Sequence, residues 1–124
     1  MKTITREKQI EAVSGWWNSD QIVKWDKQYD DWDSHTVRSL NRRLEKVLRF
    51  VDGLKLPKGA RVLELGYGAG QTALKIGQRG FEVHGVDISE KLCEIAKKRC
   101  RGECPEGKFY FKTGNIESKL EFED

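Results

Sequence analysis

The sequence predicts an α/β protein built on a Rossmann-like parallel sheet. Short β-rich runs at 61–65, 81–87 and 108–113 are separated by stretches with helical periodicity. Strands joined through helices of this length run parallel, with right-handed crossovers, which gives the spatial order 3-2-1. A glycine-rich turn follows the first strand, where sheets of this kind bind their ligands.

The composition fits one folded domain. Of 124 residues, 37% are hydrophobic and 35% are charged, and the formal net charge is +3. No apolar run approaches the roughly 18 residues of a membrane-spanning helix, and the N-terminus lacks the apolar centre of a secretory signal. Basic and acidic residues are interleaved, so we expect a cytoplasmic protein that has neither a nucleic acid nor a membrane as partner.

The first 57 residues form an aromatic, polar segment that looks helical. All four tryptophans fall within 16–32, and Trp25, Tyr29 and Trp32 would share one face of a helix. That face either packs on the body of the protein or acts as a lid over a ligand pocket. Several aspartates in the same segment would repel an anionic membrane surface.

Residues 35–52 give the clearest helix, because apolar side chains recur there at helical spacing. Asp33 or Ser34 can cap its start, and Gly53 can end it. Five basic residues lie largely on its other faces, and we expect them to form a solvated surface: Arg38, Arg42, Arg43, Lys46 and Arg49.

After Pro57, strands and helices alternate. The first strand, Arg61–Leu65, precedes a helix expected at 71–79, which Gly80 would stop. The second strand, 81–87, leads to Ser89, a favourable N-cap for the next helix. The third strand covers Lys108–Thr113.

Three cysteines make an odd number, and their spacing matches no paired zinc pattern. We expect Cys93, Cys100 and Cys104 to be free thiols in a reducing compartment. The alternatives are a metal site that combines Cys100 and Cys104 with His84, and a redox or interchain disulfide role.

The stretch VLELGYGAG at 62–70 places Gly66, Gly68 and Gly70 directly after the first strand. Glycine allows a tight turn, a positive φ or the close approach of a ligand to the backbone. The helix that follows offers unpaired N–H groups. The spacing G-x-G-x-G departs from the dinucleotide fingerprint, and the absence of a following Gly-Lys-Ser/Thr excludes a P-loop.

The second candidate anchor is Asp87, which closes the second strand. A carboxylate at that position can accept hydrogen bonds from both hydroxyls of a ribose. A glycine turn and an acid at the next strand's end, together in one β-α-β unit, favour an adenosine-containing ligand.

These residues resemble the class I S-adenosylmethionine-dependent methyltransferases. The first motif of that family is an acid, one residue and G-x-G-x-G, which reads ELGYGAG at 64–70, and the second is Asp87. The resemblance implies S-adenosylmethionine as cofactor. It implies that the three glycines pack against its methionine and ribose parts, that Asp87 holds the ribose diol, and that Ile88 lies on the adenine. Glu64 would act near the methionine ammonium, directly or through water.

The third motif is less regular. The family often has Gly-Asp and a small or apolar residue near the adenine amino group, whereas this chain has Gly114, Asn115 and Ile116. Asn115 offers a donor and an acceptor but no charge. Tyr67 stands where many relatives have cysteine, and its ring borders the methionine chain or packs inside the domain. Tyr29 resembles a Tyr-Asp element that often closes over the cofactor.

The resemblance divides the chain into an N-terminal helical lid, 1–57, and the N-terminal half of a Rossmann-like domain, 58–124. The family's sheet continues with strands four to seven, so we expect this chain to be the N-terminal portion of a larger methyltransferase, truncated before strand 4. The first strand would then keep an unpaired edge, which invites self-association.

The sequence therefore predicts a methyltransferase for a small-molecule acceptor, with no catalytic residue and no metal ligand assigned. The truncated chain alone is expected to be inactive. One alternative is a non-catalytic module that binds S-adenosylmethionine or self-associates. Another is a nicotinamide-dependent oxidoreductase, which the glycine spacing and Glu64 disfavour.

Overall fold

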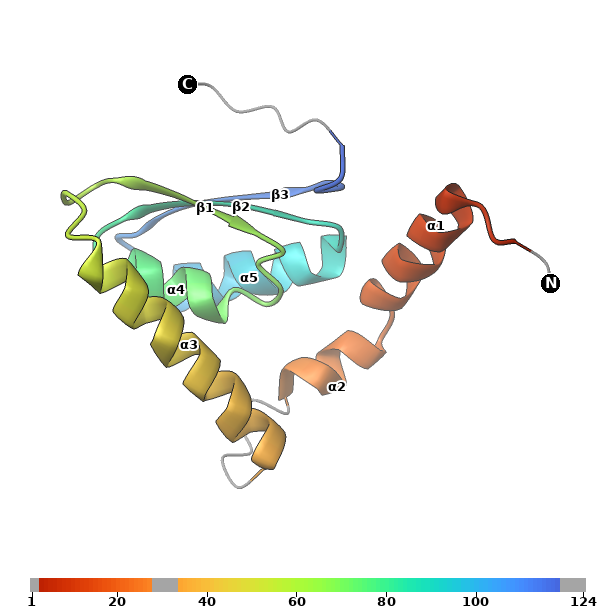
Figure 1. The fold of residues 1–124 in the computed structure, drawn as a ribbon, viewed down its shortest axis with the longest axis horizontal. Coiled ribbons are helices and arrows are strands. Elements are labelled where there is room, and N and C mark those ends of the chain that lie inside the picture. The colour runs from red at the N-terminus through yellow and green to blue at the C-terminus, as the bar shows by residue number, and fades with distance from the viewer. Residues whose placement is uncertain (1–2, 28–33, 119–124) are drawn as a thin grey trace.

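The computed structural model describes residues 3–27 and 34–118. Along the chain its elements are α1 (Arg6–Trp17), α2 (Gln21–Lys27), α3 (His35–Gly53), β1 (Arg61–Leu65), α4 (Gln71–Gly77), β2 (Glu82–Asp87), α5 (Glu90–Glu103) and β3 (Lys108–Thr113) (Figure 1). The predictions for Tyr29 and Trp32 lie outside the described residues.

The three strands form one parallel sheet in which β2 lies between β1 and β3. In this register Leu63 pairs with His84, which pairs with Tyr110. The order 3-2-1, the parallel direction and the α/β class are thereby confirmed. Within the described ranges, β1 pairs only with β2, and Leu63 and Leu65 on β1 are about half exposed.

Helices α4 and α5 lie side by side against one face of the sheet, and none of the described helices covers the other face (Figure 1). The core forms between these helices and the strands. It contains Leu74 and Ile76 from α4, Ala96 from α5, Val83 from β2 and Phe111 from β3. Helix α3 crosses beside α4 and anchors Val51 in the same core.

The helix ends follow local rules with small shifts. Ser89 Oγ accepts the N–H of Leu92 at 3.1 Å, so the predicted N-cap of α5 is confirmed. Ser34 is the N-cap residue of α3, without a side-chain hydrogen bond, and that helix runs to Gly53 as its last residue. Helix α4 ends two residues before the predicted 79, because the chain turns there toward Gly80, whose φ is +87°.

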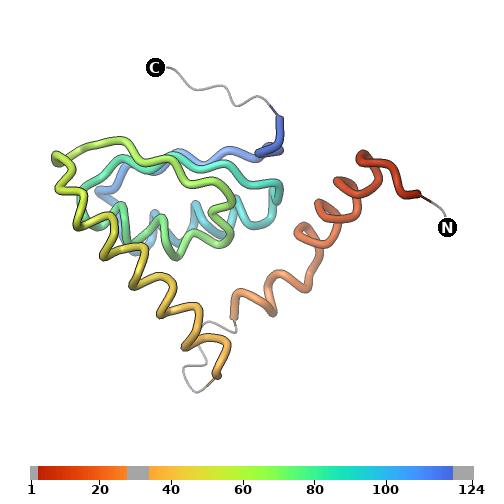
Figure 2. The backbone as a smooth tube through the Cα atoms, viewed as in Figure 1, coloured from red at the N-terminus to blue at the C-terminus, as the bar shows by residue number. Residues whose placement is uncertain are grey.

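The arm formed by α1 and α2, red to orange in Figure 2, lies beyond the ends of the strands at the right of the view. Helix α1 buries none of its residues, and α2 buries only Ile22. Ile22 packs with Ala69 of the glycine turn and Leu92 of α5. The arm is therefore attached beside the turn that the sequence singled out.

The three thiols are free and buried, and the described residues contain no group of side chains arranged to hold a metal ion. Burial raises the pKa of the Cys100 thiol to about 12, which keeps it protonated. His84 lies 2.7 Å from Glu82 and stacks on Tyr110. The helices in the described ranges are all too short or too polar to cross a bilayer.

Candidate functional site

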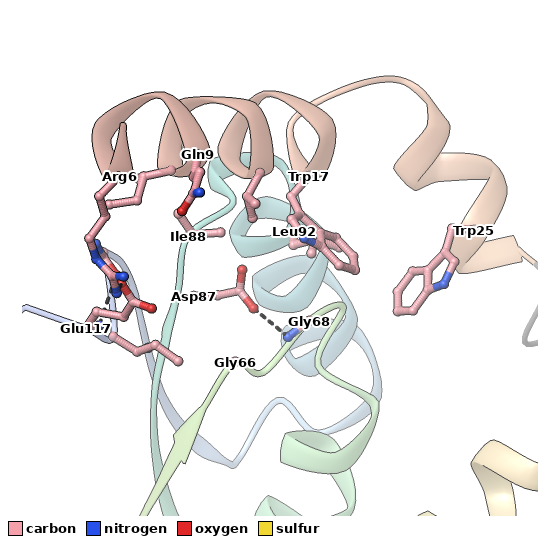
Figure 3. Close-up of a pocket in the computed structure, with 15 residues that line it drawn as sticks. Arg6, Gln9, Trp17, Trp25, Gly66, Gly68, Asp87, Ile88, Leu92 and Glu117 are labelled. Atoms are coloured by element: carbon pink, nitrogen blue, oxygen red, sulfur yellow. Dashed lines mark hydrogen bonds and ion pairs between the residues drawn. The ribbon is translucent and has the colours of Figure 1, made fainter. Parts of the chain in front are cut away.

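The carboxyl ends of the three strands meet at one edge of the sheet, and a cavity of about 510 Å³ opens there beneath α1 (Figure 3). This volume lies within the range of roughly 300–1,000 Å³ typical of small-molecule sites. Six of the predicted residues line it: Gly66, Gly68, Asp87, Ile88, Asn115 and Ile116. We call this space the first cavity.

The carboxylate of Asp87 is held in place by backbone donors. Its Oδ2 accepts the N–H of Gly68 at 3.0 Å, and its Oδ1 accepts the N–H of Ser89 at 3.0 Å. The residue is 8% exposed and its side chain reaches across the cavity floor (Figure 3). Each carboxylate oxygen has about two acceptor positions, so both oxygens retain capacity for donors on a ligand.

Gly66 and Gly68 leave room that any side chain would fill. Their φ values are +72° and +57°, and a Cβ on either would meet no atom within 4 Å. Both line the first cavity, so a Cβ there would enter the space open to a ligand. The backbone of the turn is thus exposed to the cavity.

Gly70 has a different role. Its φ is +84°, and a Cβ would lie 2.9 Å from the Cβ of Ala96 in α5. It lines neither this cavity nor the next one described. Gly70 therefore permits the turn into α4 and the close packing of α5, and it remains only a prediction as a ligand contact.

A second cavity of about 620 Å³ lies on the other side of the glycine turn, beside α3 and α4. It shares Gly66, Gly68 and Trp25 with the first cavity, so the two spaces adjoin. Glu64 lines it. The Oε2 atom of Glu64 is buried without a hydrogen-bond partner among the described residues. Burial, and then the nearby charge of Asp87, raise the pKa of Glu64 to about 7.

Tyr67 also lines the second cavity, but it is 3% exposed. Its ring lies 4.6 Å from the ring of Phe111, and its hydroxyl donates to the carbonyl of Lys112 at 3.3 Å. Burial raises the pKa of the phenol further above its usual value, so the hydroxyl is neutral. Packing is the role that this geometry supports best.

An ion pair between Asp26 of α2 and Arg99 of α5 connects the arm to the glycine turn. Arg99 of α5 donates to both carboxylate oxygens of Asp26 at 3.1 Å and also to the carbonyl of Ala69. Gln71 donates to the same carboxylate at 3.0 Å. The side chains of Arg99 and Asp26 are only 22% and 17% exposed. The residue before Asp26, Trp25, lines both cavities.

Helix α1 supplies lining that sequence reasoning missed. Ile10, Val13 and Trp17 face the first cavity, and their spacing of i, i+3 and i+7 is the signal that could have found them. Trp17 meets Trp25 edge to face, with ring centroids 5.7 Å apart. Arg6 pairs with Glu117 across the opening (Figure 3).

A family model described as "Methyltransferase domain" matches residues 62–124, which is half of the chain. The chain therefore belongs to this family, among the class I S-adenosylmethionine-dependent methyltransferases, as the motifs indicated.

Among curated proteins, the magnesium-protoporphyrin O-methyltransferase of Rhodobacter capsulatus is 37% identical over 83 residues, 64% of this chain and 37% of its own. The demethylmenaquinone methyltransferase of Leptospira interrogans is 26% identical over 111 residues, 86% of this chain and 43% of its own. This chain thus spans about two fifths of the length of these relatives.

Among solved structures, the magnesium protoporphyrin IX methyltransferase of Synechocystis PCC 6803 with bound SAM superposes with a TM-score of 0.76. The match covers 93% of this chain and 57% of that one at 21% identity. At that identity the likeness supports the fold alone.

Proposed function

We propose that this chain binds S-adenosylmethionine across the ends of β1 and β2 and contributes to methyl transfer to a small-molecule acceptor. One observation carries the proposal. The first cavity brings together the carboxylate of Asp87, which can accept the hydroxyls of a ribose, and the backbone of Gly66 and Gly68. The adjoining cavity is lined by Glu64, which has a buried carboxyl oxygen without a hydrogen-bond partner among the described residues. A nucleoside joined to an amino acid would use these groups in turn: the carboxylate for the ribose, the glycines for the linking chain and the second carboxyl group for the ammonium.

The first cavity is proposed to hold the adenosine. Asp87 would accept the ribose hydroxyls, because its oxygens keep free acceptor positions. Ile88 offers an apolar surface for the adenine, and Asn115 offers a donor and an acceptor for its edge. The rings of Trp17 and Trp25 would exclude water from the nucleoside.

The methionine part is proposed to pass Gly66 and Gly68 and to reach Glu64. A buried carboxyl oxygen without a donor is costly, and an ammonium group would satisfy it. When bound, S-adenosylmethionine supplies an electrophilic methyl group. The chain's own residues then orient the reactants and keep water away, which can account for much of a rate enhancement.

The relatives' names give the acceptor class that we propose here. They act on magnesium protoporphyrin and demethylmenaquinone, which are small molecules. We further propose that residues 1–57 act as a lid and 58–124 as part of the cofactor domain. This division is supported by Trp17 and Trp25, which come from the arm and line the first cavity.

Calorimetric titration with S-adenosylhomocysteine tests the proposal. We expect saturable binding to the chain and a loss of at least tenfold in affinity for Asp87→Ala. The matched control is Asp52→Ala, which removes an exposed carboxylate paired with Arg79 away from both cavities. Equal affinity of the two variants would refute the site, and binding of NADH instead would favour the oxidoreductase alternative.

Self-association through β1 is a separate proposal, supported by the exposed Leu63 and Leu65. Sedimentation equilibrium over a concentration series is the measurement. A strictly monomeric chain whose β1 amides resist hydrogen exchange would contradict edge pairing.

A further inference from the structure

We infer that the second cavity, between α3 and the glycine turn, binds the methyl acceptor, and that this acceptor is an apolar molecule that carries a carboxylate. The inference rests on the proposed function and names the chemistry of its second substrate. It follows from the apolar wall of this cavity, its unpaired polar atoms, its charges and its junction with the first cavity.

The apolar wall comes from the middle of α3. Leu40, Leu44 and Val47 line the cavity, and Val47 is 44% exposed. The ends of the same apolar stripe are buried, with Val37 at 1% and Val51 at 9% exposure. Helix α3 is therefore anchored at both ends while its central apolar face borders open space. An apolar ligand there would remove this surface from water.

The polar atoms are more specific. In the part of the chain that the structure describes, two buried side-chain atoms lack a hydrogen-bond partner, Nδ2 of Asn41 and Oε2 of Glu64. Both residues line this cavity. Buried polar groups in native proteins are normally satisfied. Glu64 is assigned above to the cofactor, so the Asn41 amide, a donor on α3, is left for an acceptor atom of a second ligand.

The charges around the cavity favour an anion. Arg43 of α3 and Lys75 of α4 line it, and neither forms an ion pair with any residue in the described ranges. Arg99 is also present but is occupied by Asp26. The acids that line the cavity are Glu64, which is assigned above to the cofactor, and Glu103. Two unpaired cations and an amide donor are suited to a carboxylate, which accepts several hydrogen bonds at once.

The junction with the first cavity would bring the methyl group and its acceptor into contact. Gly66, Gly68 and Trp25 form the shared wall, and the two glycines place no side chain between the spaces. A methyl group carried past these glycines would face a molecule lying against α3. Methyl transfer requires such direct contact between the two reactants.

The probes are 2-naphthoate and the neutral 2-naphthylmethanol, which share one apolar ring system. We expect calorimetry on the full chain, saturated with S-adenosylhomocysteine, to give at least tenfold tighter binding of the carboxylate. Equal binding of both probes would overturn the assignment of a carboxylate.

Variants of α3 locate the binding. Arg43→Gln and Asn41→Leu should each weaken naphthoate binding by about fivefold to tenfold, whereas Arg42→Gln, an exposed neighbour outside the cavity, should leave it unchanged. Leu44→Trp should fill the space and abolish naphthoate binding while the affinity for S-adenosylhomocysteine stays within about twofold. Should Leu44→Trp fail to fold, as judged by thermal melting, the two milder variants decide.

The outcomes separate this inference from the proposed function. If S-adenosylhomocysteine binds but naphthoate competes with it, the cavity serves the methionine tail alone and the inference is wrong. If Arg42→Gln weakens naphthoate as much as Arg43→Gln, the probe binds to general surface charge and the inference is wrong again. If S-adenosylhomocysteine itself does not bind, the proposed function fails first.

Discussion

Replacement of Glu64 by glutamine should flatten the pH dependence of stability. Burial, reinforced by the charge of Asp87, raises the pKa of Glu64 from 4.5 to about 7. Between these values the folded chain keeps a proton that the unfolded chain has lost. The free energy of unfolding is therefore highest below pH 4.5, falls as the pH rises toward 7, and is constant above it.

The size of the effect follows from the same values. A difference of about 2.5 pH units, at about 1.4 kcal/mol for each unit, corresponds to on the order of 3 kcal/mol. Total stabilities of domains are only about 5–15 kcal/mol. The Glu64 side chain is not fully enclosed, so this figure is an upper limit.

Urea denaturation at several values between about pH 4.5 and 8 measures this dependence. The stability of the parent chain should fall relative to that of Glu64→Gln between pH 4.5 and about 7, and the difference should then stay constant. Glu103→Gln is the control, because Glu103 lines the same cavity from an exposed position. If the parent chain and Glu64→Gln give parallel curves, Glu64 is not the titrating group and the reasoning is refuted.

Three further predictions concern the glycine turn and the arm. Asp87→Asn should lower the affinity for S-adenosylhomocysteine by about tenfold to a hundredfold in calorimetry, because hydrogen bonds to a charged acceptor contribute about 1.5–3 kcal/mol. Gly70→Ala and Gly59→Ala should each lower the free energy of unfolding by about 1–2 kcal/mol, because both positions have a positive φ. Gly70→Ala alone should lose a further amount of about 1–3 kcal/mol of unfolding free energy in urea denaturation, because its Cβ would clash with α5. Equal losses in the two variants would contradict this packing. Asp26→Asn should speed hydrogen exchange in α2, whereas Asp20→Asn should not, because the Asp20 side chain is fully exposed in its ion pair with Lys91.

The sheet and the glycine turn could be predicted from the sequence because their signals are local. The runs around Val62, Val83 and Phe111 carry the strand pattern within a few residues, and Ser89 marks a helix start by itself. The fold class follows from the order of these elements, since parallel strands need helical crossovers. Asp87 was placed by the same logic, as the last residue of the second strand.

The lining contributed by the arm could not be predicted in the same way. The contact between Asp26 and Arg99 joins residues 73 positions apart, and no local pattern in the sequence predicts it. Trp25, which precedes Asp26 in the arm, lines both cavities, so this long-range contact joins the arm to both. Nothing in the sequence distinguishes Asn41 from other polar residues on a helix, whereas the structure buries its amide nitrogen without a partner among the described residues and places the residue in the lining of the second cavity.

The bare backbone between the two cavities has a consequence for inhibitor design. A single compound that links a thioether nucleoside to an aromatic acid could pass Gly66 and Gly68, because neither of these residues places a side chain there. Once one half is bound in its cavity, the tether would raise the effective concentration of the other half at the second binding position. Such a bisubstrate molecule should bind more tightly than either half, and the length of its tether would gauge the distance between the two chambers.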